Sequence, residues 1–127
     1  MYSVSIREHV LLAHSLKKEV FGPAAKLHGA TYVVDAEFRT HELDENNIVI
    51  DIGLAAEILK DVLGKINFRN LDDMKEFQGH ITTTEFIAKF IHEEIKKKVS
   101  TLFNGWLKIT LHESHVAWAS YEGKIGG

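Results

Sequence analysis

Residues 31–40, TYVVDAEFRT, alternate between two kinds of side chain. Tyr32, Val34, Ala36 and Phe38 fall in one phase, and the charged residues of the segment fall in the other. Because successive side chains of a β-strand point to opposite faces, this pattern predicts a strand with one face in a core and one face in solvent. A strand of this kind is typical of an antiparallel sheet that is covered on one side only.

Other segments are predicted to be further strands. Residues 2–6 (YSVSI) alternate in the same way, and 48–52 (IVIDI) follow the turn signal DENN and are predicted to form a short strand. Residues 106–113 (WLKITLHE) and 116–121 (VAWASY) are predicted to be the last two strands.

Two segments carry apolar residues at helical spacing, 54–66 and 86–95, and the second ends at a basic KKK run that suits the helix dipole. The predicted order is β-β-β-α-α-β-β, or ββααββ if the strands on either side of the DENN turn count as one hairpin. We therefore expect a single α+β domain over residues 1–127, with an antiparallel sheet and two helices on one face.

Composition excludes several classes of function. The formal net charge of −3 gives no basic surface for nucleic acid, and the absence of cysteine excludes disulfides, thiolate ligands and a cysteine nucleophile. No apolar run is long enough to span a membrane, and residues 1–15 lack the pattern of a signal peptide. No P-loop or GxGxxG motif is present. A cytoplasmic protein is expected.

Glu113 is the first candidate site residue. It is in phase with the apolar residues Leu107, Ile109 and Leu111, where a carboxylate is costly unless it is paired. Either the strand ends at His112 and Glu113 is in solvent, or Glu113 anchors a ligand that carries adjacent N–H donors.

The segment ITTTEF (81–86) is the second candidate, at the start of the longer helix. Thr82 and Glu85 have the spacing of a capping box. A helix N-terminus rich in hydroxyl groups also makes a polar wall for a ligand, and the two interpretations are compatible.

Histidines are the third candidate feature. His14 and His28 are predicted to lie on different strands, and they make up two ligands of a possible zinc site, which needs three or four. Of the other histidines, His92 is expected on the solvated side of its helix, and only His115 is expected to be free to approach the site.

Motifs in this order along the chain resemble the 6-pyruvoyltetrahydropterin synthase and 6-carboxytetrahydropterin synthase family. They are His14, then LHGATY, NIVIDI, INFRNLD, TTTEFIA and LHES. The resemblance covers nearly the whole chain. It implies the tunnelling fold, in which ββααββ subunits join their sheets into an oligomeric barrel, typically a hexamer with ligand sites between subunits.

The zinc and catalytic positions of the family are incompletely kept. The resemblance makes His14 and His28 zinc ligands, but Ala30 stands where the HGH motif has its second histidine. Residues 21–27 (FGPAAKL) hold neither the catalytic cysteine nor the glutamate of some variants. In the LDHxxLN element, here 66–72, asparagine and phenylalanine replace the aspartate and the histidine.

The residues that hold the pterin in the family are kept. Glu113 matches the glutamate that pairs with the pterin ring, and Thr83, Thr84 and Glu85 match the start of the second helix. The resemblance therefore implies a homologue that binds a pterin-like ligand, without zinc and without synthase chemistry.

Two alternatives remain open. One is an enzyme on a pterin or purine-like substrate that uses metal-independent acid/base chemistry, as dihydroneopterin aldolases of the same fold do, with Lys26, His28 or His115 as proton-transfer groups. The other is a structural or partner-binding oligomer in which Glu113 pairs with a cation.

Overall fold

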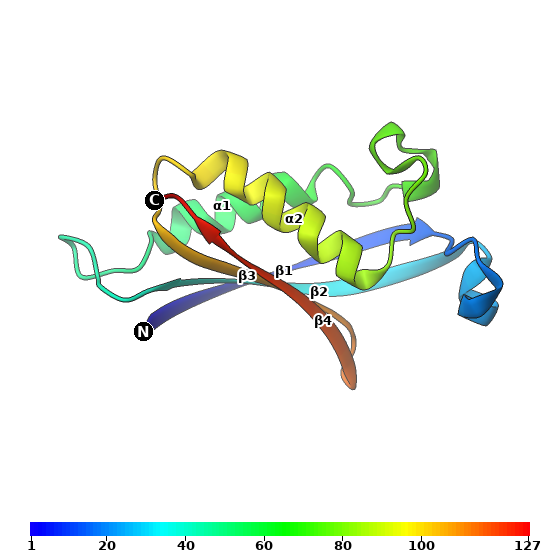
Figure 1. The fold of residues 1–127 in the computed structure, drawn as a ribbon, viewed down its shortest axis with the longest axis horizontal. Coiled ribbons are helices and arrows are strands. Elements are labelled where there is room, and N and C mark those ends of the chain that lie inside the picture. The colour runs from blue at the N-terminus through cyan, green and yellow to red at the C-terminus, as the bar shows by residue number, and fades with distance from the viewer.

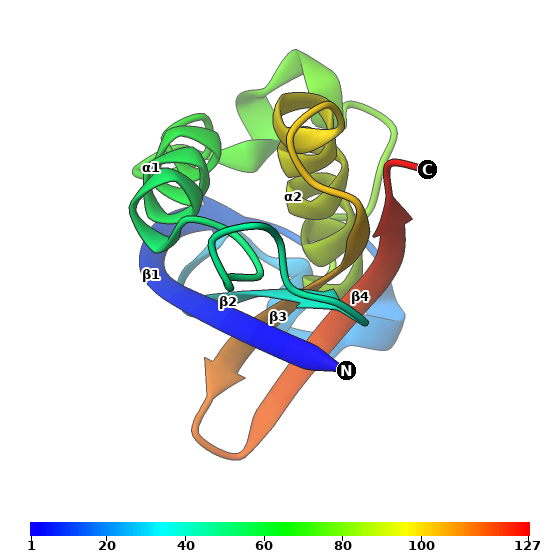
Figure 2. The same cartoon turned by 90° about the vertical axis from the view of Figure 1, so that its left-hand side faces the viewer.

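Four strands form one antiparallel sheet in chain order, in a computed structural model that describes all residues 1–127. They are β1 (Tyr2–His14), β2 (His28–Thr40), β3 (Gly105–Ser114) and β4 (Ala117–Ile125). Two helices, α1 (Ile52–Leu63) and α2 (Thr84–Val99), lie across one face of the sheet (Figures 1 and 2). This confirms the ββααββ order and the α+β class.

Short 3₁₀ helices occupy the connections. They are η1 (Glu19–Ala25) between β1 and β2, and η2 (Leu71–Asp73) and η3 (Lys75–Phe77) between α1 and α2. No helix is both long enough and apolar enough to cross a membrane.

The core lies between the sheet and the two helices. The inward phase of β2 is buried from Tyr32 to Phe38, as its alternation predicts. The helices close the core with residues at helical spacing, namely Ala55, Ile58, Leu59, Val62 and Leu63 from α1, and Ile87, Ala88, Ile91, Ile95 and Val99 from α2.

The strand predicted over 48–52 is wrong. Val49 and Ile50 lie in a bend and are buried in the core, and Ile52 is the first residue of α1. Asp51 is the N-cap of that helix, and its carboxylate accepts a hydrogen bond from the Gly53 amide. The apolar run 48–52 has no strand to pair with. It therefore leads into α1 instead of forming a strand, because Asp51 caps that helix.

His92 also differs from the prediction. It is 1% exposed, and its Nε2 lies 3.3 Å from the carbonyl oxygen of Gly123 in β4. A Cβ atom at position 123 would stand 2.9 Å from the His92 ring. Glycine in β4 therefore lets the histidine side of α2 pack directly on the sheet.

The sheet divides at one end. β2 pairs with β3 only from Val33 to Arg39, opposite Trp106 to His112. The earlier part of β2 pairs only with β1, and the end of β3 pairs only with β4, with a register shift between His112 and Ser114. A fork between β2 and β3 therefore opens where β3 ends, and the β3–β4 hairpin curves away from β2 there (Figure 1).

Candidate functional site

Two histidines face each other at the forked end of the sheet. His14 is the last residue of β1, His28 is the first of β2, and the two are direct cross-strand partners. Their ring centroids lie 4.6 Å apart, and His14 is only 2% exposed. The prediction that they come from different strands is confirmed, and the antiparallel register brings them together.

Each of these rings is held through its Nδ1 atom. His14 Nδ1 lies 3.0 Å from the Thr82 hydroxyl oxygen, and His28 Nδ1 lies 2.9 Å from the carbonyl oxygen of Lys26. Because a carbonyl oxygen only accepts, His28 donates through Nδ1, and its Nε2 makes no hydrogen bond within the protein. Burial, and then the neighbouring His28, lower the pKa of His14, which favours its neutral form. Metal-ligating histidines are oriented in the same way, with one ring nitrogen anchored.

Ala30 occupies the third position of the implied zinc site. Side chains two residues apart in a strand share a face, so Ala30 lies on the same side of β2 as His28. No group of three or more His, Asp and Glu side chains is placed to hold a metal ion. Because zinc sites use three or four protein ligands, the residues present do not fit the zinc centre of the family.

His115 does not join the histidine pair. It lies between β3 and β4 and lines a cavity with Arg7 and His112 instead. The expectation that it approaches the zinc position is therefore wrong, because His115 forms no metal-binding group with His14 and His28.

Glu113 lies within β3 and contacts the start of α2. The Thr84 hydroxyl donates a hydrogen bond of 3.0 Å to Glu113 Oε1. This contact puts Glu113 on the helix side of the sheet, as its phase with Leu111 predicts, and the strand does not end at His112. The side chain is nevertheless exposed, and its Oε2 has no protein partner, so it is free to accept hydrogen bonds from a ligand.

The start of α2 is capped by a different threonine from the one predicted. Thr83 is the N-cap, and its hydroxyl accepts a hydrogen bond from the Phe86 amide at 3.2 Å. The residue three positions after the cap is Phe86, so the capping box of Thr82 and Glu85 is wrong. Thr82 is free to hold His14, and Glu85 lies in the first helical turn, where a negative charge suits the dipole.

The 66–72 element packs along the end of β1. The Asn67 side-chain oxygen accepts from the Leu11 amide at 3.0 Å, and the Asp72 carboxylate accepts from the Ser15 amide and hydroxyl at 3.2 and 2.6 Å. Phe68 has a φ of 61° and is 78% exposed. Asn67 thus makes a backbone contact and Phe68 points into solvent, and these are the two positions that the resemblance compares with an aspartate and a histidine.

Tyr32 is a site residue that sequence reasoning missed. Its side chain is 0% exposed, and its hydroxyl has no hydrogen-bond partner although it lies beside Thr84 and near Glu113. Burial raises the pKa of Tyr32, so the hydroxyl stays protonated and is a donor. The sequence contained one indication of this role, because Tyr32 places a hydroxyl group among the apolar residues that face inward from β2.

Replacing Tyr32 with phenylalanine tests whether its hydroxyl is unpaired in the folded protein. Removing a buried donor that makes no hydrogen bond is neutral or stabilising, by up to about 1 kcal/mol in the free energy of unfolding. We expect Tyr32→Phe to unfold at the same urea concentration as the parent or a higher one. A loss of more than about 1 kcal/mol would show that the hydroxyl is paired in solution.

Residues 3–124 match the family model described as 6-pyruvoyl tetrahydropterin synthase. The chain belongs to the 6-pyruvoyl tetrahydropterin synthase family. A 6-carboxy-5,6,7,8-tetrahydropterin synthase of Bacillus subtilis (strain 168) is 26% identical over 125 residues, which are 94% of this chain and 84% of that protein.

Solved structures agree with this membership. A 6-pyruvoyl tetrahydropterin synthase of Caenorhabditis elegans superposes with a TM-score of 0.83 at 26% identity, over 96% of this chain and 95% of the other. The Plasmodium falciparum enzyme superposes with a TM-score of 0.77 over 98% of each chain, at 17% identity, which shows the fold alone. The tunnelling fold expected for the subunit of this 6-pyruvoyl tetrahydropterin synthase family member is confirmed.

Proposed function

We propose that this family member binds a pterin-like ligand at Glu113 and does not carry out the zinc-dependent synthase reaction. The observation that carries the proposal is the Glu113 carboxylate, which Thr84 holds through Oε1 while Oε2 is unpaired and exposed. A ring with an amino group beside a ring N–H would donate to such a carboxylate through two parallel hydrogen bonds.

Neighbouring groups support the same ligand. Thr83, Thr84 and Glu85 form the first turn of α2 beside Glu113, and the Tyr32 hydroxyl is a buried donor with no partner in the protein. Buried polar groups without a protein partner commonly bind a ligand or an ordered water. The site therefore offers both an acceptor and a donor to a polar heterocycle.

The chemistry of the proposed site is limited by what replaces the family's reactive groups. Alanine at position 30 leaves two histidine ligands, and position 68 has no imidazole. Lewis-acid activation and the associated proton transfer both depend on those positions in the family. We therefore propose that neither zinc nor another cofactor is part of the working protein.

The assembled protein is proposed to be a cytoplasmic homo-oligomer of this single domain, with a hexamer as the expected size. β1 and β4 each form one edge of the sheet, so one side of each strand has no partner within the chain. Pairing of these edges between copies would satisfy their backbone groups and close a barrel. Light scattering on the purified protein would measure the number of subunits.

A panel of pterins tests the proposed ligand class. We expect neopterin or biopterin to bind with micromolar affinity, because two charge-assisted hydrogen bonds and ring burial supply about 8 kcal/mol. Fluorescence titration with EDTA and with added zinc should give the same Kd. Failure of every pterin to bind, or binding only with zinc, would contradict the proposal.

A further inference from the structure

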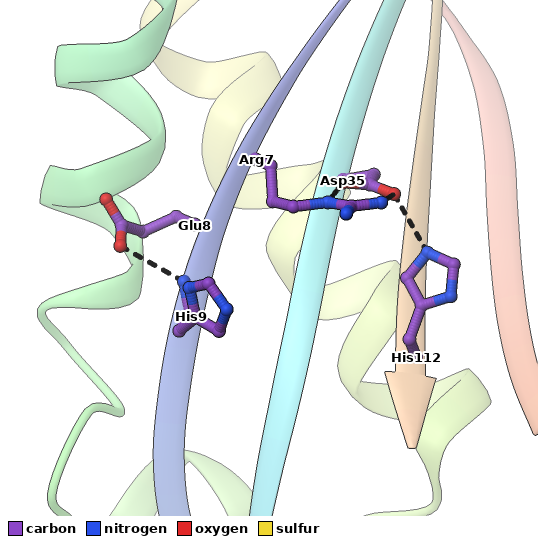
Figure 3. A network of polar contacts seen from close by, with 5 residues as sticks. All are labelled: Arg7, Glu8, His9, Asp35 and His112. Carbon is purple, nitrogen blue, oxygen red and sulfur yellow. Dashed lines mark hydrogen bonds and ion pairs between the residues drawn. The ribbon is translucent and has the colours of Figure 1, made fainter. Parts of the chain in front are cut away.

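A network of charged side chains crosses three strands on the face of the sheet that carries no helix (Figure 3). Arg7 in β1 donates through Nε and Nη2 to the two carboxylate oxygens of Asp35 in β2, at 2.7 and 2.9 Å. His112 in β3 contacts Asp35 Oδ2 through Nε2 at 2.8 Å. The network therefore lies on the opposite face from the Glu113 carboxylate, which Thr84 of α2 holds.

The Arg7 guanidinium has a second edge that is free. A guanidinium carries five N–H groups in a planar fork, so it can bind one oxyanion side-on and another end-on. Asp35 takes the side-on edge, formed by Nε and Nη2. The end-on edge, formed by Nη1 and the second N–H of Nη2, makes no hydrogen bond, and the side chain is 61% exposed. Because the pair with Asp35 fixes the plane of the guanidinium, this free edge is held ready for a further acceptor.

His112 has a free ring nitrogen. The hydrogen bond from Arg7 above all lowers the pKa of Asp35, so Asp35 is an ionised acceptor. His112 therefore donates to Asp35 through Nε2, and its Nδ1 makes no hydrogen bond within the protein. The ring packs on Trp118 of β4 with centroids 5.6 Å apart, which limits its rotation. A proton taken up at Nδ1 would give the fixed ring a second donor.

The fork between β2 and β3 adds a backbone donor. The Leu11 amide bonds to Asn67 Oδ1 and the Leu11 carbonyl accepts from the Phe68 amide, so both groups point away from β2. Thr31 stands opposite Leu11, and in an antiparallel ladder its own amide and carbonyl then point toward β3. The pairing of β2 with β3 begins only at Val33, so these two groups of Thr31 have no strand partner.

These groups border one cavity of about 330 Å³ at the fork. It is lined by Arg7, Thr31, Val33, His112, Glu113, Ser114 and His115. Ser114 Oγ accepts from the Val116 amide at 3.3 Å, which leaves the Ser114 O–H to donate. Glu113 is the one acidic residue of the lining, and its carboxylate contacts Thr84 on the helix face instead. Donors therefore outnumber acceptors around the cavity, which suits a negatively charged ligand.

We propose that this cavity is a binding site for a small oxyanion, either a carboxylate or a phosphate-type group. The end-on edge of Arg7 donates two N–H groups to it, and His112, the Thr31 amide and the Ser114 hydroxyl donate from the other sides. The proposal is independent of the ligand at Glu113, because the two sites lie on opposite faces of the sheet.

A network that only joins the strands is the structural alternative. A surface ion pair of this kind contributes little stability. It requires neither a guanidinium edge without a partner nor a cavity bordered by donors. The two interpretations differ in whether ions bind at this cavity.

Titration with sulfate and with acetate tests the site. Sulfate represents a tetrahedral group and acetate a planar carboxylate. The NMR signals of the Arg7 Nε–H and of the His112 ring should move and saturate, with a Kd of about 10 mM or lower for at least one of the two ions. The ion that binds more tightly identifies the class of group. Saturation by neither ion overturns the proposal.

Two arginine variants show whether the Arg7 edge is responsible. Arg7→Lys keeps the charge but loses the planar edge, and it should weaken binding at least about tenfold, the value of a hydrogen bond to a charged group. Arg39→Lys is the matched control, because Arg39 lies on the same face, pairs with Glu122 and does not border the cavity. It should leave the Kd unchanged. Equal losses in the two variants, or no loss in Arg7→Lys, would mean that the ions respond to the general charge of the face, which overturns the site.

The pH dependence tests the part assigned to His112. The charged and titratable groups around this ring are Arg7 of β1, Asp35 of β2, and Glu113 and His115 of the β3–β4 hairpin. Imidazoles gain a proton between about pH 8 and about pH 5, whereas sulfate and acetate stay ionised near pH 6. We therefore expect binding to be about threefold tighter at about pH 6 than at about pH 8, the scale of one exposed charge pair.

His112→Gln should remove most of this pH dependence. His9→Gln is the matched control, because His9 is an exposed histidine of β1 that does not border the cavity, and it should keep the wild-type dependence. A Kd that does not change with pH, or an unchanged dependence in His112→Gln, would overturn the role of His112 in the site.

Discussion

Glu113→Ala is expected to abolish pterin binding, with a loss of at least about 100-fold in affinity. The substitution removes the carboxylate that would accept the two N–H groups of the ring, and truncating one partner of a hydrogen-bonded charge pair costs about 2–5 kcal/mol. Fluorescence titration would measure the change. Because the side chain is exposed in the free subunit, thermal unfolding should move by little.

Two comparisons make this result specific. Thr84→Val removes the hydroxyl that holds Glu113 Oε1 and should weaken binding less, by about tenfold, the value of one hydrogen bond to a charged group. Glu45→Ala removes an exposed carboxylate from the turn before α1 and should not change the Kd. Pterin binding that survives in Glu113→Ala would remove Glu113 as the anchor.

The strands and helices were predicted correctly where the spacing of apolar residues along the chain is enough to determine the structure. The inward phase of β2 from Tyr32 to Phe38 is buried as its alternation requires. The prediction failed over 48–52, where the β-branched residues favour a strand but Asp51 favours the start of a helix. A strand needs a partner at the right register, and that is a property of the whole sheet, whereas Asp51 needs only the amide of Gly53.

Parts of the candidate site were accessible to sequence reasoning for the same reason. Glu113 was found because a carboxylate in an apolar phase is a local anomaly. The Asp35–His112 contact was not found, since it depends on which residues of β2 and β3 stand opposite each other. The unpaired Tyr32 hydroxyl likewise follows from where the start of α2 lies over the sheet, which no local pattern fixes.

Ala30→His is expected to create a zinc site. The new imidazole would lie on the same face of β2 as His28, next to the cross-strand pair of His28 and His14. Both existing rings already have Nδ1 anchored, which leaves Nε2 for a metal ion. Three histidines and one open position form a complete zinc site.

The gain in zinc binding of Ala30→His over the parent should be large. We expect about one zinc per chain in Ala30→His and far less than one in the parent, with an affinity difference of at least about 100-fold by chelator competition. The larger side chain should lower the stability of the metal-free variant by about 1–3 kcal/mol, since Ala30 packs against the core. Added zinc should then raise the Tm of the variant and not that of the parent.

Thr31→His provides the matched control, because it adds the same imidazole one residue further along β2, on the opposite face. It should bind no more zinc than the parent. Equal gains in the two variants would show that any added histidine suffices, and stoichiometric zinc in the parent would show that His14 and His28 already belong to a working centre. A gain confined to position 30 would mean that one side chain separates this protein from the zinc coordination of its family.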